Sequence, residues 1–444
     1  MKKTGFHKKT AREIACILLA RIENKGAYID RLLVSDKVMG LDPRDRAFIR
    51  ELLPGVLRWK LRLDRIIDVY YNKTSSGLDN DIRNIVRLGL FQIMFMNSVP
   101  EWAAVNESVE SAIKIRGKGA GGLVNALLRR YIREGEPKEW PSDPVEKMAF
   151  ELSHPMWIVK KWIEKYGFET AGAIMKSGVE KHPVFVRPGK IGIGIDELAD
   201  TLTHEGYEVT VVPEMSGYLA VSKGSRLFDT VAFKEGLLTV QDPSAGMASL
   251  LLSPESGENV LDLCAAPGGK TTHLALLMKD SGHIKAVDIH SHRLELIKDT
   301  VKRLGLKSVE CTEGDVTGLR NETGVFYNRV LLDVPCTGTA VLSKRPDLKW
   351  RVTREDVLRL ASLQQEMLHS AASMVKPGGI LVYSTCSLEP EENEDTIALF
   401  LAKHLEFVVD RDNRFDRYEK NSGYLILPHQ MFGSGAFASK LRKK

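Results

Sequence analysis

The sequence predicts a multidomain protein with an all-α N-terminal domain, a small α+β connector and a C-terminal α/β, Rossmann-like domain. Three observations predict this fold class. Helical periodicity with few strand signals fills residues 1–135, a charged, proline-containing stretch marks a boundary at 134–144, and strand-like and helical segments alternate from about residue 237 onward. We therefore place the domains at residues 1–140, 146–236 and 237–444, and 444 residues fit about three domains of ~150 residues.

The N-terminal domain is predicted to be a series of amphipathic helices. Asp42 is the expected N-cap of one of them, and Pro43 its first helical residue. Another helix is predicted at 82–94, where apolar residues recur at helical spacing. We interpret the glycine-rich stretch 117–122 as a flexible turn before a further helix at 123–132.

Positive charge is concentrated in this first part of the chain. Residues 1–138 contain 26 Lys and Arg against 16 Asp and Glu, a net charge of +10, whereas the whole chain carries +5. A basic module attached to a mildly acidic body favours a polyanion such as nucleic acid as partner. A solvated basic face is the alternative that charge alone leaves open.

The remainder of the chain supplies the strands. The connector is expected to contain helices at 157–166 and 195–205 and strands at 184–187 and 207–212. The C-terminal domain is expected to contain strands at 260–264, 284–289, 309–312, 329–334, 379–384, 407–409 and 424–427, with helices from 270, at 292–304, 354–375 and 390–402. Such alternation implies a doubly wound parallel sheet, whose ligands bind outside the carboxyl ends of the strands.

The cysteines are five in number and widely spaced, with no Cys-x-x-Cys pair. This pattern favours a reducing compartment, with neither a disulfide framework nor a zinc site. Cys16 and Cys311 are expected to be small apolar core residues. No run approaches the roughly 18 apolar residues that cross a bilayer. We expect a cytoplasmic protein without a membrane segment and without a metal.

A glycine loop and three acids follow successive predicted strands. Asp288, Asp315 and Asp333 end the second, third and fourth strands, at positions suited to a ribose diol, an adenine edge and a cationic sulfonium. The loop follows the first strand, lacks the Gly-x-Gly-x-x-Gly spacing of dinucleotide binders, and allows close approach of a ligand at its two glycines. Together these features favour S-adenosylmethionine over a nicotinamide cofactor. The loop reads Cys264-Ala265-Ala266-Pro267-Gly268-Gly269-Lys270.

Two further cysteines, Cys336 and Cys386, each follow a predicted strand at the same rim. A thiolate can add to C6 of a pyrimidine and make C5 nucleophilic, and a second group must then help to release the product. Lys270 and the basic stretch 344–351 are candidate sources of the positive charge that stabilises a thiolate. The same stretch is a candidate contact for RNA phosphates, with Trp350 stacking on a base, or alternatively a solvated loop. The pattern predicts a pyrimidine C5 methyltransferase, and spacing leaves open which cysteine attacks.

These motifs resemble those of the bacterial 16S rRNA (cytosine-5) methyltransferases of the RsmB/Sun type, over nearly the whole chain. The N-terminal domain is similar to the all-helical, RNA-binding NusB domain. The residues that carry the first resemblance are Gln241-Asp242-Pro243-Ser244, Asp262-Leu263 with the glycine loop and Thr271, Asp333-Val334-Pro335-Cys336-Thr337-Gly338-Thr339, Arg345-Pro346-Asp347-Leu348-Lys349-Trp350, Tyr383-Ser384-Thr385-Cys386-Ser387 and Glu391-Glu392-Asn393. Those that carry the second are Asp45-Arg46, Gly55-Val56-Leu57-Arg58, Arg87-Leu88-Gly89-Leu90-Phe91-Gln92 and Val124-Asn125-Ala126-Leu127-Leu128-Arg129.

The resemblance implies methylation of C5 of a specific cytosine in 16S rRNA, free or in an early small-subunit particle, by an enzyme that uses S-adenosylmethionine. We expect the protein to be a monomer. The resemblance implies that Cys386 is the nucleophile that bonds to C6 and that Cys336 assists product release. In the mechanism that we predict, Asp333, with Lys270, also holds the base and favours protonation at N3. The resemblance also assigns the loop from Cys264 to Lys270, with Asp288, Asp315 and Asp333, to the cofactor.

Three places depart from the family pattern and leave the target nucleotide open. The chain has Ser434-Gly435-Ala436-Phe437 where the family often has Asp-Gly-Phe-Phe, Ala340 where glycine is common, and Pro188-Gly189 after Arg187. Methylation of another RNA such as tRNA, a non-catalytic role in rRNA assembly and a small-molecule methyltransferase are the alternatives.

Overall fold

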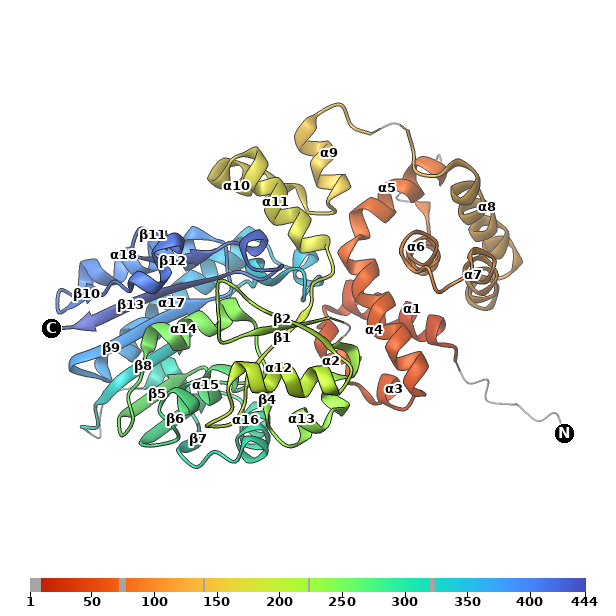
Figure 1. Cartoon of the computed structure of the whole chain (residues 1–444). Helices are drawn as coiled ribbons and strands as arrows, with labels where there is room; N and C mark the ends of the chain where they lie inside the picture. The colour runs from red at the N-terminus through yellow and green to blue at the C-terminus, as the bar shows by residue number, and fades with distance from the viewer. Residues whose placement is uncertain (1–8, 72–76, 139, 223, 320–323) are drawn as a thin grey trace. The chain divides into compact units, whose positions relative to one another are not determined.

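The computed structural model describes residues 9–71, 77–138, 140–222, 224–319 and 324–444, which group into two compact units (Figure 1). Unit 1 contains Met1–Glu180 together with Leu342–Arg351, and unit 2 contains Lys181–Val341 and Val352–Lys444. The boundary falls inside the predicted connector, because the helices up to residue 179 group with unit 1 and the strands from residue 184 with unit 2. The predicted division at 1–140, 146–236 and 237–444 stays a prediction.

Unit 1 is helical in its described part, as the sequence predicts. Asp42 accepts hydrogen bonds from the backbone N–H groups of Arg44 and Asp45, which confirms it as an N-cap followed by Pro43. The helices are α1 (Ala11–Lys25), α2 (Ile29–Leu33), α3 (Asp36–Met39), α4 (Pro43–Arg58), α5 (Lys60–Tyr71), α6 (Asn80–Phe95), α7 (Glu101–Arg116), α8 (Lys118–Glu134), α9 (Pro144–Glu151), α10 (Met156–Tyr166) and α11 (Phe168–Val179).

The glycines at 117–122 do not form the flexible turn that we predicted, because α8 already begins at Lys118. Gly117 alone makes the connection, with a φ of +84°. A Cβ on Gly121 would lie 2.5 Å from the Ile113 side chain of α7. The glycine at this position therefore allows two helices to pack closely.

Helix α6 is the centre of unit 1. Every residue from 82 to 92 is buried, and the helix packs against α1, α4, α5, α7 and α8. Figure 1 shows α6 along its axis, with α4, α5, α7 and α8 around it. A helix that is buried all round must also bury its polar side chains, and these need partners.

Arg87 of α6 is one of those polar side chains, and three other side chains accept its hydrogen bonds. Its Nε lies 2.7 Å from Oδ1 of Asp64 and its Nη2 2.8 Å from Oδ2, so the pair is bidentate. Its Nη1 donates to Glu23 and Asn84, both at 2.7 Å. Burial raises the pKa of Asp64, but the nearby cations, Arg87 first among them, outweigh burial and lower it. This cluster ties α6 to α1 and α5.

The segment Leu342–Arg351 belongs to unit 1, although it lies within the predicted α/β domain in sequence. Lys349 is 1% exposed, and its Nζ donates to the carbonyl oxygens of Arg58 and Ser153, both at 2.9 Å. Trp350 donates from Nε1 to the carbonyl of Leu57 at 2.7 Å and packs on the helical core. These carbonyls lie at the ends of α4 and α9, where a helix lacks internal donors.

The prediction that the stretch 344–351 contacts RNA is therefore wrong for Lys349 and Trp350. The Lys349 ammonium and the Trp350 indole N–H both donate to backbone carbonyl groups of unit 1. Arg345 forms an ion pair with Asp30 at 3.0 Å.

Unit 2 contains a small antiparallel sheet of order β2-β3-β1-β4. Its strands are β1 (Val184–Pro188), β2 (Glu208–Val211), β3 (Leu219–Ser222) and β4 (Leu238–Val240), and its helices are α12 (Ile195–His204) and α13 (Val231–Lys234). These elements enclose their own core, so the strands predicted for the connector are confirmed.

The large sheet of unit 2 has the order β11-β12-β13-β9-β8-β5-β6-β7, with β10 paired to β13. The five strands from β7 to β9 in this order are parallel, and the strand order reverses between β5 and β8. Such a reversal is where open α/β sheets bind their ligands. The strands are β5 (Asn259–Leu263), β6 (His283–Asp288), β7 (Val309–Glu313), β8 (Tyr327–Asp333), β9 (Val375–Thr385), β10 (Phe407–Val409), β11 (Glu419–Lys420), β12 (Gly423–Ile426) and β13 (Ala436–Lys443).

The sheet is mixed, not wholly parallel as predicted. Strand β13 runs antiparallel to both β9 and β12. We did not predict β13, because its small and basic residues lack a strand-like alternation and its pairing is non-local. The helices around the sheet are α14 (Pro243–Leu252), α15 (Gly269–Leu277), α16 (Ser291–Leu304), α17 (Arg354–Ser373) and α18 (Glu394–Lys403). Short 3₁₀ turns occur at Gly224–Asp229, Val316–Gly318, Thr339–Val341, Leu348–Trp350, Pro390–Glu392, Asn413–Tyr418 and Pro428–Gln430.

Among the described residues, no helix combines the length and the hydropathy that crossing a bilayer requires.

Replacing Arg87 with Met should destabilise unit 1 by about 3 kcal/mol, because Asp64 and Glu23 lose a buried cation. Urea unfolding followed by tryptophan fluorescence measures this unit, since all six tryptophans lie in it. Arg133→Met, at an exposed position, is the control and should change the free energy of unfolding by less than about 1 kcal/mol. Equal stability of the two variants would contradict the role assigned to the cluster. The tryptophans are Trp59, Trp102, Trp140, Trp157, Trp162 and Trp350.

Candidate active site

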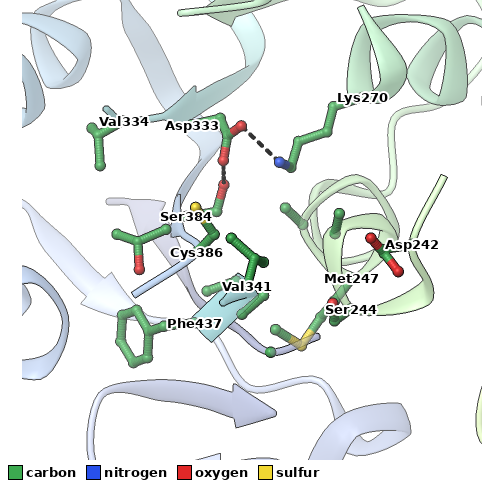
Figure 2. Close-up of a pocket in the computed structure, with 16 residues that line it drawn as sticks. Asp242, Ser244, Met247, Lys270, Asp333, Val334, Val341, Ser384, Cys386 and Phe437 are labelled. Carbon is green, nitrogen blue, oxygen red and sulfur yellow. Dashed lines mark hydrogen bonds and ion pairs between the residues drawn. The ribbon is translucent and has the colours of Figure 1, made fainter. Parts of the chain in front are cut away.

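A pocket opens at the carboxyl ends of β8 and β9, beside the point where the strand order reverses (Figure 2). Lys270 at the start of α15 and Asp242 before α14 line one part of it. Asp333 ends β8, Cys386 follows the last residue of β9, and Phe437 comes from β13. The parallel ladder pairs Asp333 with Ser384, so two strand ends that are distant in sequence meet at one rim.

Lys270 and Asp333 form an ion pair inside this pocket. The lysine Nζ lies 2.7 Å from Oδ2 of Asp333, while Oδ1 accepts a hydrogen bond from the Ser384 hydroxyl at 2.7 Å (Figure 2). Burial alone would lower the pKa of Lys270, but the adjacent carboxylate outweighs burial and raises it. Lys270 is therefore a cation in the pocket. Its partner Asp333 accepts a hydrogen bond on each carboxylate oxygen, which fixes the orientation of that side chain.

The two cysteines of interest lie in contact. The Sγ atoms of Cys336 and Cys386 are 3.0 Å apart, and the backbone N–H of Cys386 donates to Sγ of Cys336 at 3.2 Å. The hydrogen bond from Cys336 lowers the pKa of Cys386, against the opposing effects of burial and of Asp333. The pKa of Cys336 is raised well above its usual value, first by the same contact and then by burial. Of the two thiols, Cys386 is therefore the one that loses its proton more easily.

The other cysteines are less suited to chemistry. Burial raises the pKa of Cys16 to about 12 and also raises the pKa values of Cys264 and Cys311. Cys16 is buried in the core of unit 1, as predicted. Cys311 is only partly buried, where it packs on a small apolar cluster beside the glycine loop.

The glycine loop after β5 turns sharply around Asp288. Cys264 has a φ of +60° and Gly268 a φ of +98°, and α15 begins at Gly269. The Asp288 carboxylate accepts from the backbone N–H of Ala266 at 3.2 Å and pairs with Arg293 at 3.5 Å. Asp288, the last residue of β6, is thus in contact with the glycine loop, at the edge of the sheet where its position at a strand end predicted it.

Asp315 lies apart from that cluster. Its side chain is exposed, and one oxygen accepts from both the backbone N–H and the hydroxyl of Thr317. The residue therefore shapes the turn after β7, at the same edge of the sheet.

Two buried polar residues, Arg187 and Asp262, form hydrogen bonds with residues at the end of the glycine loop and the start of α15. We did not predict either of them from the sequence as a site residue. Arg187 donates to the carbonyl of Gly269 at 3.0 Å and to Oε1 of Gln241 at 2.6 Å. Asp262 accepts from the Thr271 hydroxyl at 2.6 Å, and burial raises its pKa to about 7. The sequence signal that could have identified them is a charged residue within an otherwise apolar strand, Arg187 in β1 and Asp262 in β5.

These residues fit the cofactor that the sequence predicts. The loop backbone lies at the end of β5, and carboxylates stand at or just beyond the ends of β6, β7 and β8. Together with the mixed sheet, they define a Rossmann-like methyltransferase domain.

Comparison with known proteins gives the family. Residues 249–442 match the model of the 16S rRNA methyltransferases RsmB/F, residues 9–133 match the NusB family, and residues 154–225 match the ferredoxin-like domain of RsmF/B-like methyltransferases. A probable ribosomal RNA small subunit methyltransferase B of Bacillus subtilis is 36% identical over the full length of both chains. A ribosomal RNA small subunit methyltransferase B of Klebsiella pneumoniae is 33% identical over 98% of each chain. This chain therefore belongs to the family of ribosomal RNA small subunit methyltransferases B.

Solved structures agree with the fold. The structure titled "Crystal Structure of PH0851" has a TM-score of 0.81 and 28% identity, and covers 98% of this chain and 99% of its own. A methyltransferase homolog protein from Pyrococcus horikoshii has a TM-score of 0.61 at 28% identity, over 68% of this chain and 100% of its own. The predicted family, fold class and cofactor are confirmed, and the protein is an S-adenosylmethionine-dependent rRNA methyltransferase.

Gly268→Ala should weaken the binding of S-adenosylmethionine about tenfold. A side chain at this positive φ costs about 1–2 kcal/mol, and its Cβ would lie 3.2 Å from Ile297. Isothermal titration calorimetry measures the affinity. Gly305→Ala is the matched control, because it has a similar φ of +71° at the end of α16 with open space around its Cβ. If both variants bound the cofactor equally well, the loop would not be part of its site.

Proposed function

We propose that this protein methylates C5 of a specific cytosine in 16S rRNA through a covalent bond between Cys386 and C6 of the base. The observation that carries this proposal is the contact between Cys386 and Cys336 beside the Lys270–Asp333 pair. Pyrimidine C5 is a poor nucleophile until a group adds at C6, and that group must later leave. Two thiols in contact at the rim of a methyltransferase sheet suit these two tasks.

The electrostatics of the pair support Cys386 as the attacking group. The thiolate is the reactive form of cysteine, and the pKa of Cys386 is lowered while that of Cys336 is raised. Lys270 adds a positive charge that also lowers the pKa of Cys386. Sequence spacing alone did not order the two cysteines, whereas this asymmetry favours the order that the family resemblance implies.

The reaction that we propose begins with a cytosine turned out of its stack, since a stacked base hides its C5–C6 edge. The Cys386 thiolate bonds to C6, while Asp333, aligned by Lys270, holds the base and favours a proton at N3. The electron pair released by this addition makes C5 nucleophilic. S-adenosylmethionine supplies the methyl group as an electrophile. We assign its binding to the loop from Cys264 to Lys270 and to Asp288, Asp315 and Asp333.

Release reverses the addition. A base removes the C5 proton, the C5–C6 double bond re-forms, and the Cys386 sulfur leaves as a thiolate. We assign to Cys336 the assistance of this step, because its sulfur is within 3.0 Å of the departing one. The balance of the reaction requires no metal, and the described residues contain no cluster of metal-ligating side chains.

The rRNA partner suits the basic N-terminal part of the chain. Residues 1–138 carry a net charge of +10 and match the NusB family over most of their length. We propose that this part holds the rRNA by its phosphates, that the protein acts as a monomer, and that it works in the cytoplasm.

The experiment that tests the proposal combines the protein, labelled S-adenosylmethionine and unmodified small-subunit rRNA, followed by sequencing for 5-methylcytosine. One modified cytosine is the expected result. Label in tRNA alone, or methyl groups at another atom, would overturn it. Cofactor binding without methylation of any RNA would favour a non-catalytic role in assembly.

Cys386→Ala should abolish methyl transfer while S-adenosylmethionine still binds, because no nucleophile remains to activate C5. The rate of label incorporation into rRNA checks this. Cys311→Ala is the control, as Cys311 lies on β7 and lines no part of the pocket, and it should retain the normal rate. Normal activity of Cys386→Ala would refute the covalent mechanism.

Cys336→Ala should instead trap the protein on its substrate, because addition and methyl transfer proceed but elimination is slow. A slowly migrating protein–RNA band that survives denaturing electrophoresis is the expected observation. The band should be absent in the double variant Cys336→Ala/Cys386→Ala. A single variant that turns over without any such band would exclude the release role.

A further inference from the structure

The acid Glu392 has no place in the mechanism above, yet it lies next to both cysteine loops. It closes the 3₁₀ turn Pro390–Glu392, and its side chain is 0% exposed. Its Oε1 accepts from the backbone N–H of Thr337 at 2.9 Å and from Nε2 of Gln364 at 3.0 Å. Its Oε2 accepts from the hydroxyls of Thr337 and Ser387.

Three of the four donors belong to residues that directly follow a cysteine, and the fourth belongs to Gln364. Thr337 directly follows Cys336, and Ser387 directly follows Cys386. Gln364 of α17 also donates to the carbonyl of Pro335, the residue before Cys336, at 2.9 Å. One carboxylate therefore fixes the chain on both sides of Cys336 and on one side of Cys386.

The neighbouring residue Asn393 completes the support of the second loop. Its Oδ1 accepts from the Thr385 hydroxyl at 2.6 Å, and its Nδ2 donates to the carbonyl of Ser387 at 2.9 Å. The residues before and after Cys386 are thus both held. Asn393 has a non-helical backbone conformation, with φ −116° and ψ −105°, and it separates the 3₁₀ turn from α18. The continuous helix that we predicted from 390 to 402 is therefore interrupted at this residue.

Burying a charged carboxylate costs several kcal/mol unless hydrogen bonds or opposite charges compensate it. Burial raises the pKa of Glu392, and the hydrogen bonds from Ser387 and Thr337 oppose that rise. Only an ionised carboxylate offers acceptor sites enough for four converging donors. The arrangement is therefore specific to an acid and specific to the spacing of the two loops.

We propose that Glu392 is a positioning residue, whose carboxylate sets the distance and orientation between Cys336 and Cys386. Its role in catalysis rests on the proposed function, whereas its effect on the two thiols is a property of the protein alone. A displaced Cys336 no longer donates to Cys386 and no longer reaches the sulfur that must leave. Both the ionisation of the nucleophile and the release of the product then suffer.

Two variants separate geometry from charge. Glu392→Asp keeps the charge and shortens the side chain by one methylene, so that it no longer spans both loops. Glu392→Gln keeps the size but replaces Oε1 or Oε2 with a donor, which faces groups that are themselves donors. Glu391→Gln is the matched control, because it removes the adjacent acid of the same turn and leaves Glu392 with its four hydrogen bonds in place.

The first measurement needs no RNA. The rate of alkylation of Cys386 by iodoacetamide, followed by peptide mass spectrometry across a pH series, gives the pH at which its thiolate forms. Four groups face Cys386, namely Cys336, Asp333, Lys270 and Glu392. Losing the bond from Cys336 raises that pH, and losing the negative charge of Glu392 lowers it slightly. We therefore expect a clear upward shift for Glu392→Asp and a smaller one for Glu392→Gln.

The second measurement is methyl transfer to rRNA under saturating substrates. We expect kcat to fall on the order of 100-fold in Glu392→Asp, as for a misplacement of about 1 Å, with KM for rRNA and the affinity for S-adenosylmethionine unchanged. The protein–RNA adduct should also persist longer than in the wild type. A role in folding alone would lower the melting temperature and leave the alkylation profile and the adduct lifetime of the folded protein unchanged.

The outcomes distinguish the two proposals. Alkylation profiles of both Glu392 variants that coincide with that of Glu391→Gln would overturn the positioning role, whatever the RNA assay gives. A wild-type protein that methylates no cytosine would overturn the proposed function, while a shifted alkylation profile would still support the role of Glu392 in placing the two thiols.

Discussion

The parallel pairing of β8 with β9 is the constraint on which the site depends. It sets Asp333 opposite Ser384, and everything at the rim follows from that register. The carboxylate receives the serine hydroxyl, and the chain continuing from each strand delivers one cysteine. A shift of the pairing by one residue would turn every side chain of the shifted strand to the other face of the sheet. The two sulfurs, 50 residues apart in the chain, would then lose their contact.

Two opposite charges in the pocket form a local pair. The Lys270 ammonium lies 2.7 Å from the Asp333 carboxylate, so the pair carries no net charge while each group still acts on its immediate neighbours. Glu392 lies behind the cysteine loops and is surrounded by neutral donors. The remaining asymmetry is between the two thiols, because their contact lowers the pKa of Cys386 and raises that of Cys336. Geometry therefore controls reactivity here, and the residues that fix geometry are spread over β8, β9, α17 and the turn at Pro390–Glu392.

The sequence was most informative where structure is set by local contacts. Asp42 and Pro43 mark the start of α4 because capping needs only neighbouring residues. The acids and cysteines at strand ends were also predictable, since strand ends in an α/β domain share one rim. We predicted Lys349 to be an exposed cation. The prediction was wrong because the carbonyl oxygens that accept its hydrogen bonds, those of Arg58 and Ser153, are distant from it in sequence. Strand β13 and the role of the Glu392 carboxylate were not predicted for the same reason, because only the folded chain brings their partners together.

The placement of Leu342–Arg351 in the helical unit has a consequence for synthesis. A domain made of one continuous stretch can finish folding as soon as that stretch leaves the ribosome. Unit 1 is discontinuous, and its last pieces are the Lys349 ammonium that meets two helix ends and the Trp350 ring on its core. Until residue 351 emerges, those carbonyls stay hydrated and that part of the core stays open. The helical part of this enzyme therefore reaches its final form only after most of the glycine-loop half of the catalytic sheet has been translated.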